Sequence, residues 1–278
     1  MPLIADSSLQ SLSHAYPAAP ALLHHSLEGH PLLDYPALAE AARALPQSHV
    51  ERRVADAVNG GDFAHDSASG QDAATLLETM QVDGNWIMLR CVEQLPAYRK
   101  LLEELIAVIA PAISPATGTA RNIKGFVFIS APGTLTPFHF DCEHNILFQV
   151  RGDKQFATYP PAPPWLPLDR HEAYFAAGDN MLPWQEDYLG DARVHSLTAG
   201  DALFVPYASP HWVKAGSTPS ISLSMTWQCD WSHIAADAML ANPLLRRIGA
   251  GMDRAPAWPA RPRWRAWCGR VARRAGLA

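Results

Sequence analysis

Two histidines and one aspartate, in the order His-x-Asp … His, stand out in Thr136-Pro-Phe-His-Phe-Asp-Cys-Glu-His-Asn145 and in the later Ser209-Pro-His-Trp212. His139 and Asp141 are two residues apart, so on a β-strand both side chains would point to the same face. His211 follows a tight turn, a buried strand and a short loop, and it could reach the same point from a distant strand. The pattern predicts a metal site made of His139, Asp141 and His211.

Two imidazoles and one carboxylate are the ligand set of the facial triad, which fills one face of an octahedron and leaves the opposite face open for chemistry by iron. A single His-x-Asp is weak evidence, because a chain with twelve histidines contains roughly one by chance. The placement on a strand and the distant third ligand strengthen it. Zinc, manganese or cobalt would suit the same ligands, so the sequence leaves the metal open. The alternative is that His139 and His211 are ordinary core or surface histidines.

The chain of 278 residues changes its pattern after Asn122, from helical periodicity to short runs of β-branched and aromatic residues. Turn residues such as Pro132-Gly133 and Gly200-Asp201 separate these runs. The predicted strands are 125–130, 134–140, 145–150, 155–159, 194–197, 202–205, 212–215 and 221–228. About eight short strands in succession predict a mainly β fold, a double-stranded β-helix of the jelly-roll or cupin type, with flanking helices.

The predicted organisation has three parts. Residues 1–115 form a mostly helical N-terminal region that packs on the barrel, residues 116–230 form the barrel, and residues 231–278 form C-terminal helices and a tail. The barrel contains an insertion at 161–192, which has six acidic residues against Arg170 alone. A loop of this length inside a compact β domain is often a lid or binding loop.

Several flanking elements are predicted from local signals. Helices are expected at 36–45 and 72–80, and a strand at 86–92. A helical apolar stripe covers 95–109, and Pro111 is expected to end that helix. After the barrel, Ser232 is predicted to cap a helix through 234–241. Pro243 is predicted to open a second one.

The run from Thr136 to Lys154, with Gln149 and Gly152 inside it, and the later Gly200-Asp-Ala-Leu-Phe-Val-Pro206 before His211, resemble the JmjC/cupin-like (cupin 8) family. Members of this family are Fe(II)- and 2-oxoglutarate-dependent oxygenases, and the chain is similar to the asparaginyl hydroxylase type that acts on hypoxia-inducible factor. The resemblance covers roughly 122–228. It implies an enzyme that uses Fe(II), 2-oxoglutarate and O2.

The resemblance also assigns roles to individual residues. It implies that His139, Asp141 and His211 bind iron and perform the catalysis. Thr136 and Lys154 would hold the distal carboxylate of 2-oxoglutarate, with Asn145 near its chelating end. Lysine suits this role, because it carries a point charge on a long apolar stem. A polar residue of the last strand is also expected near the co-substrate, and Ser222, Ser224 and Thr226 remain the alternatives.

The reaction implied by the resemblance yields succinate, CO2 and a hydroxylated protein side chain, peptide or small molecule. Hydroxylation of an N-methyl group would instead lead to demethylation. A catalytically silent cupin-type binding protein is a further alternative, since a fold does not fix a function.

The charge is divided unevenly along the chain. The net charge is −5, but residues 246–278 carry nine arginines and one acid, so this tail has +8 and the remainder −13. A tail rich in arginine and tryptophan could pack on the acidic body, lie on a membrane surface, or bind nucleic acid; we do not expect the last. The C-terminal helices could pair two subunits into a homodimer, as in related proteins. The absence of a signal sequence, of an apolar segment long enough to span a bilayer, and of paired cysteines predicts a cytoplasmic protein.

Overall fold

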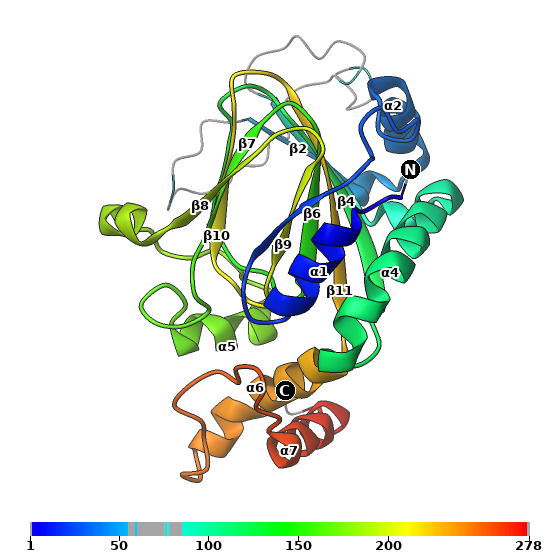
Figure 1. Ribbon diagram of the computed structural model, residues 1–278. Coiled ribbons are helices and arrows are strands. Elements are labelled where there is room, and N and C mark those ends of the chain that lie inside the picture. The colour runs from blue at the N-terminus through cyan, green and yellow to red at the C-terminus, as the bar shows by residue number, and fades with distance from the viewer. Residues whose placement is uncertain (1, 55–58, 60–74, 76, 78–84, 277–278) are drawn as a thin grey trace.

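Two antiparallel sheets face each other in the computed structural model of the protein and enclose a barrel (Figure 1). The structure describes residues 2–54, 59, 75, 77 and 85–276. The larger sheet has the strand order β1-β9-β6-β11-β4-β3-β2, and the smaller one has the order β5-β10-β7-β8. This architecture confirms the predicted jelly-roll, cupin-type fold with flanking helices.

The eight strands predicted after Asn122 are all present. They are β4 (Arg121–Ser130), β5 (Leu135–His139), β6 (His144–Arg151), β7 (Lys154–Thr158), β8 (Arg193–Leu197), β9 (Asp201–Val205), β10 (His211–Ala215) and β11 (Ser220–Gln228). Some of these strands have one buried face and others are buried on both faces, and a closed barrel needs both patterns. Every residue of β11 except Gln228 is buried, because one face lines the barrel and the other faces helices.

The N-terminal region contributes strands as well as helices. β1 (Ala21–His24) pairs with β9 at one edge of the larger sheet, while β2 (Val50–Val54) and β3 (Asn85–Arg90) extend its other edge. Only β3 matches a predicted strand. The division of the chain at residue 115 stays a prediction, but the sheet itself draws on both sides of that boundary. The helix predicted at 72–80 lies outside the described residues, apart from positions 75 and 77.

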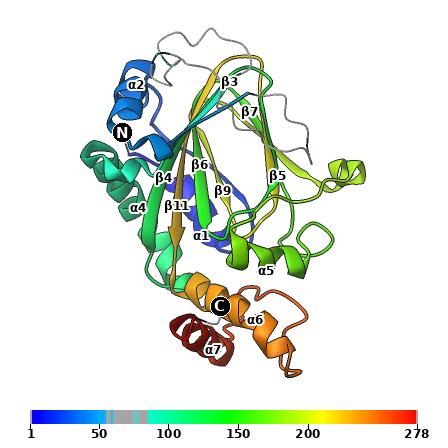
Figure 2. The same ribbon diagram turned by 180° about the vertical axis from the view of Figure 1, so that it is seen from behind.

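The N-terminal helices cover the outer face of the larger sheet, and α4 runs along it beside β4 (Figure 2). They are α1 (Asp6–Ala15), α2 (Tyr35–Ala44) and α4 (Pro96–Thr117), with the short turns η1 (Gln47–His49) and η2 (Val92–Gln94) between them. The main hydrophobic core lies in this layer. Leu12, Leu38 and Leu105 of the helices pack there with Ile129 and Trp227 of the sheet.

The predicted end of the long helix at Pro111 is wrong. α4 continues through Pro111 and Pro115 to Thr117. Ile113 and Thr117 are buried in the added turns, and this packing compensates for the hydrogen bonds that proline removes. The helix ends at Gly118, whose φ of +88° suits glycine.

The helix after the barrel also differs from its prediction. α6 (Asp230–Arg246) is one helix that passes through Pro243. Its N-cap is Cys229, and Ser232 is the third helical residue, whose hydroxyl accepts a hydrogen bond from the Cys229 backbone N–H at 2.8 Å. Buried Asn242 anchors the last turn through hydrogen bonds to Glu172 and to the Met252 backbone, so the helix persists despite its proline.

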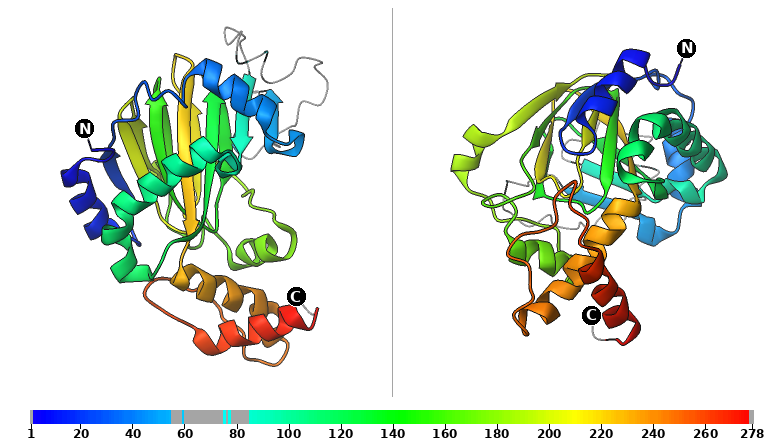
Figure 3. Two further views of the ribbon diagram at one scale, coloured as in Figure 1. Left: turned by 90° about the vertical axis from the view of Figure 1, so that its right-hand side faces the viewer. Right: turned by 60° about the horizontal axis from the view of Figure 1, so that its bottom comes forward.

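The insertion at 161–192 is partly helical, which its sequence did not indicate. It contains α5 (Leu168–Ala177) and η3 (Glu186–Asp191). The chain then continues after α6 to α7 (Arg263–Arg274), which packs along α6 at one end of the barrel (Figure 3). Among the described residues, no helix has both the length and the apolar character needed to cross a membrane.

Candidate metal centre

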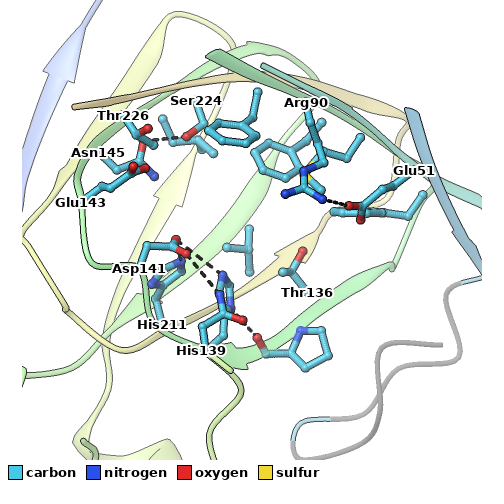
Figure 4. Close-up of a pocket in the computed structure, with 18 of the residues that line it drawn as sticks. Glu51, Arg90, Thr136, His139, Asp141, Glu143, Asn145, His211, Ser224 and Thr226 are labelled. Carbon is cyan, nitrogen blue, oxygen red and sulfur yellow. Dashed lines mark hydrogen bonds and ion pairs between the residues drawn. The ribbon is translucent and has the colours of Figure 1, made fainter. Parts of the chain in front are cut away.

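The three predicted metal ligands meet where β5 ends and β10 begins. β5 and β10 are antiparallel neighbours, and His139 is the pairing partner of His211. The register of this strand pair therefore places the two histidines side by side although 71 positions separate them. Asp141 was expected on the same strand as His139, but it lies two residues beyond the end of β5. Its carboxylate nevertheless turns back toward both rings (Figure 4).

The ligand atoms converge closely. Oδ2 of Asp141 lies 3.9 Å from Nε2 of His139 and 3.7 Å from Nε2 of His211, and the two ring centroids are 4.1 Å apart. Metal bonds of about 2.1 Å place neighbouring ligand atoms roughly 3.0 to 3.4 Å apart in octahedral or tetrahedral geometry. The three ligand atoms all lie within 4.8 Å of one another, so the side chains fit one metal ion after a small inward movement.

Both imidazoles are oriented by backbone carbonyls. Nδ1 of His139 donates to the Pro137 carbonyl at 2.7 Å, and Nδ1 of His211 donates to the Ser209 carbonyl at 2.9 Å. A proton held on Nδ1 leaves the Nε2 lone pair free for a metal. Burial, assisted by the nearby His139, lowers the pKa of His211 to about 4. This ring is therefore neutral at pH 7, as a ligand must be.

Asn180 of the insertion supports the carboxylate ligand. Its side-chain amide donates to Oδ1 of Asp141 at 3.3 Å, and its backbone carbonyl accepts from the Phe140 N–H at 3.1 Å. The next residue, Met181, forms an isolated β-bridge with His139. The segment thus holds both ends of the His-x-Asp unit. Sequence reasoning missed Asn180, because no local pattern distinguishes this asparagine.

All six predicted site residues line one cavity of about 440 Å³. Besides the three metal ligands, these are Thr136 on β5, Asn145 on β6 and Lys154 on β7. Within the described part of the chain, His139, Asp141 and His211 are also the one group of three His, Cys, Asp or Glu side chains close enough to share an ion. Of these ligands, Asp141 is the more accessible, with 37% of its side chain exposed, whereas the side chain of His211 is 5% exposed.

Lys154 is a buried cation without a carboxylate beside it among the described residues. Its ammonium lies 5.8 Å from the ring centroid of Phe128, on the opposite sheet. Burial lowers the pKa of Lys154 to about 7. A lysine in this setting is costly to keep charged unless an anion joins it.

The sequence left three polar side chains of the last strand as alternatives near the co-substrate, and two of them face the cavity. Ser224 and Thr226 line it, and the Ser224 hydroxyl donates to Oδ1 of Asn145 at 2.7 Å. Ser222 instead donates to Oε1 of Gln149 at 2.7 Å and does not line the cavity. The pairing of β11 with β6 explains the contact, because Ser224 and Asn145 are on adjacent strands.

Charged pairs surround the outer part of the cavity. Glu51 accepts hydrogen bonds from Arg53 at 2.9 Å and Arg90 at 2.5 Å. Burial would raise the pKa of Glu51, but the two guanidinium groups outweigh it and lower the pKa. Lys124 donates to Glu143 at 3.2 Å. The sequence did not indicate the first cluster, because it did not reveal that β2 and β3 join the barrel.

Comparison with known proteins gives one family match and several more distant ones. The model of the family described as "Cupin-like domain" matches residues 71–231. The Drosophila melanogaster protein "Jumonji C domain-containing protein 5" is 27% identical over 133 residues, which cover 40% of this chain and 29% of that protein. The chain therefore spans less than a third of that relative.

Solved structures of YcfD from Escherichia coli are also similar. One matches with a TM-score of 0.49 and 15% identity, and covers 95% of this chain and 65% of that chain. Another, described as a ribosomal oxygenase in complex with cobalt and 2-oxoglutarate, matches with a TM-score of 0.44 and 15% identity, covering 87% and 57%.

The family model covers more than half of the sequence and includes all three candidate metal ligands. It ends within α6, so the Arg- and Trp-rich tail lies beyond it. The chain belongs to the cupin-like domain family, and the JmjC/cupin-like membership predicted from its motifs is confirmed.

Proposed function

We propose that this protein is an Fe(II)- and 2-oxoglutarate-dependent oxygenase that hydroxylates a protein side chain, a peptide or a small molecule. One observation carries the proposal. Two histidine Nε2 atoms and one aspartate oxygen converge on the wall of a cavity that also encloses the buried cation of Lys154. A metal ion could bind these three ligands and keep coordination positions open. An anionic co-substrate could bind beside Lys154.

His139, Asp141 and His211 would hold the iron. Bound there together with 2-oxoglutarate and O2, iron supplies the oxidising chemistry that inserts one oxygen atom into a C–H bond and releases succinate and CO2. The protein keeps the ligands in place. The Pro137 and Ser209 carbonyls fix the two imidazoles, and Asn180 fixes the carboxylate.

Lys154 and Thr136 would bind the distal carboxylate of 2-oxoglutarate. Both flank β10, since Thr136 lies on β5 and Lys154 on β7, and both side chains face the cavity. A carboxylate beside Lys154 would restore the charge that burial disfavours, and so raise the pKa of the amine. The hydroxyl of Thr136 can donate to the same group.

Asn145 would orient the chelating end of 2-oxoglutarate. Its Oδ1 accepts from Ser224, so its Nδ2 is the atom left to donate into the cavity. Apolar side chains line the space between these polar groups, namely Phe126, Phe128, Leu147, Phe156 and Val213. They would exclude water from the reacting centre once a substrate covers the exposed side of Asp141.

The direct test is turnover of 2-oxoglutarate. Purified protein supplied with 2-oxoglutarate, Fe(II) and O2 should form succinate, slowly even without substrate. Asp141→Ala or His211→Ala should abolish succinate formation. A Lys214→Met variant is the matched control, because Lys214 is exposed on the same strand as His211. Absence of succinate together with absence of iron binding would contradict the proposal.

The same assay separates the two oxidative outcomes once a substrate is found. A hydroxylase leaves a stable product heavier by one oxygen atom. An N-methyl demethylase releases formaldehyde and leaves a lighter product, which mass spectrometry distinguishes directly. A protein that binds iron and 2-oxoglutarate without any turnover would be a silent binding module.

A further inference from the structure

α7 has an inner face of small residues that packs closely on α6. Ala266, Gly269 and Ala272 are buried there. A Cβ atom added to Gly269 would lie 1.9 Å from the backbone carbonyl oxygen of Asp237 on α6, so the two helices touch at this point. Such close contact fixes which side of α7 turns outward.

Ion pairs hold the same orientation. Arg270 and Arg273 donate to the two carboxylate oxygens of Asp237 at 3.1 and 2.8 Å. These bonds involve two of the arginines of the tail and the one acidic side chain that α6 offers there. α7 thus forms the outermost layer at this end of the molecule, with α6 between it and the barrel (Figure 3).

The outer face of α7 is apolar in its middle and basic at its margin. Trp264, Trp267 and Val271 are 51%, 61% and 44% exposed, and their spacing of three, four and seven places them on one side of the helix. Exposed Arg263 and Arg274 lie along the same side. Neither makes an ion pair with any residue that the structure describes.

We propose that the outer face of α7, made of Arg263, Trp264, Trp267, Val271 and Arg274, docks on an anionic membrane surface. An interfacial helix carries tryptophan and aliphatic side chains on one side and basic groups around them, and it inserts only its apolar face. α7 has twelve residues, or a length of roughly 18 Å, so it would lie in the plane of the lipid head groups. The tail's charge of +8 complements anionic lipids.

Nucleic acid fits this face less well. Base stacking needs open aromatic faces, but the guanidinium of Arg265 covers one face of Trp264, at 4.3 Å from its ring. Val271, the third apolar residue of the stripe, offers no stacking surface. Both features are neutral or favourable at a lipid interface, where aliphatic side chains enter the acyl boundary.

A second copy of the chain also fits less well. A twofold contact between outer faces would bring Arg263 and Arg274 of both copies together, and like charges repel across such an interface. The body of the protein is acidic, but in a symmetric contact of this kind the outer face of α7 would meet the same face of the other copy and not its acidic body. Lipid head groups supply the negative charge without that conflict.

The test uses the full chain and sedimentation with vesicles. The protein should bind vesicles of equimolar phosphatidylcholine and phosphatidylglycerol, and not vesicles of phosphatidylcholine alone. Trp264→Ser with Trp267→Ser should weaken binding roughly tenfold or more. Arg263→Gln with Arg274→Gln should weaken it roughly 25-fold, since each arginine near an anionic surface contributes roughly fivefold.

Matched controls remove surface groups of the same kind elsewhere. Leu189→Ser removes an exposed apolar side chain, at 52% exposure, and Arg99→Gln with Lys100→Gln removes two exposed cations of α4. Both controls should bind vesicles as the unaltered protein does. Thermal unfolding should show that all variants are folded, because every substituted side chain is exposed. The proposal is independent of the metal centre, so Asp141→Ala should also bind normally.

Other outcomes overturn the proposal. Equal binding to neutral and anionic vesicles, or binding that survives both α7 variants, would remove the role of this face. Binding to single-stranded polyuridylate without binding to vesicles would assign the face to nucleic acid. A dimer in light scattering that the tryptophan variant converts to monomer, again without vesicle binding, would assign it to a second copy.

Discussion

The side-chain amide of Asn180 donates to Oδ1 of Asp141 at 3.3 Å, while Oδ2 of the same carboxylate faces the two histidines. One oxygen is thus held by the insertion and the other is presented to the metal centre. Asn180 is a positioning residue, because its side-chain amide bonds the ligand Asp141 and is not itself one of the candidate metal ligands. Such supporting hydrogen bonds typically account for a factor of 10 to 100 in metal affinity.

Asn180→Ala should therefore weaken binding of Fe(II), or of Co(II) as an air-stable probe, by roughly 10- to 100-fold. Titration calorimetry with the metal alone measures this without any substrate. Gln155→Ala is the matched control, since Gln155 is an exposed amide on β7. Unchanged metal affinity in Asn180→Ala would show that the hydrogen bond has no positioning role.

Lys154→Met should abolish saturable binding of 2-oxoglutarate, because the amine carries the charge that would meet the distal carboxylate. Metal affinity should stay within about twofold, because the amine lies away from the metal ligands. Lys214→Met, on the neighbouring strand and exposed, should leave both affinities unchanged. Calorimetry with 2-oxoglutarate added to the metal-loaded protein gives both values. Tight 2-oxoglutarate binding by Lys154→Met would assign the co-substrate to other groups.

The same substitution should raise stability. Burial lowers the pKa of Lys154 to about 7, below that of an unfolded lysine. The unfolded chain therefore binds more protons between about pH 7 and 10, and the free energy of unfolding rises with pH across this range. Lys154→Met removes this dependence and should stabilise the protein at pH 7 by on the order of 2 kcal/mol. Denaturant unfolding at pH 7 and pH 9 checks both effects.

The barrel and its six candidate residues could be anticipated from sequence because their signals are local. Strand alternation and turn residues place Thr136 and His139 on one strand, β5, and the family motif adds Asn145 on β6 and Lys154 on β7. Pairing register then brings all of them to one cavity without further information. The end of β5 before Asp141 was the one local detail that alternation did not anticipate.

The features that sequence reasoning missed depend on tertiary contacts. Glu51 reaches the cavity only because β2 pairs with β3 far along the chain. Asn180 gains its role from the way the insertion folds back on β5. Pro111 and Pro243 are tolerated in helices because buried residues on both sides of each proline stabilise the helix by packing. Local sequence rules do not include this packing energy.

His144→Phe should make the protein less sensitive to acid. His144 is fully buried among Tyr16, Phe204 and Trp227, and neither of its ring nitrogens has a partner among the described residues. Burial lowers its pKa to about 3, so the unfolded chain takes up this proton first as the pH falls below about 6.5. Stability is therefore lost between about pH 6.5 and 3.

In denaturant unfolding at pH 6 and pH 4, His144→Phe should reduce the loss of unfolding free energy by up to about 1.4 kcal/mol per pH unit. A residual dependence remains, because burial also lowers the pKa of His171 to about 4. His14→Gln replaces an exposed histidine of α1 and should leave the slope unchanged. An identical slope in His144→Phe and the unaltered protein would show that His144 is hydrated in solution.

Gly269→Ala should separate α7 from α6. The added methyl group would lie 1.9 Å from the Asp237 carbonyl oxygen, which is backbone and cannot rotate away. Overpacking of this kind costs about 1 to 3 kcal/mol, and moving the helix also weakens the ion pairs of Arg270 and Arg273 with Asp237. Denaturant unfolding measures the loss, and proteolysis between α6 and α7 should become faster. Gly190→Ala is the control, since a Cβ there meets no atom within 4 Å. Equal stability and proteolysis in both variants would contradict the close packing of these helices.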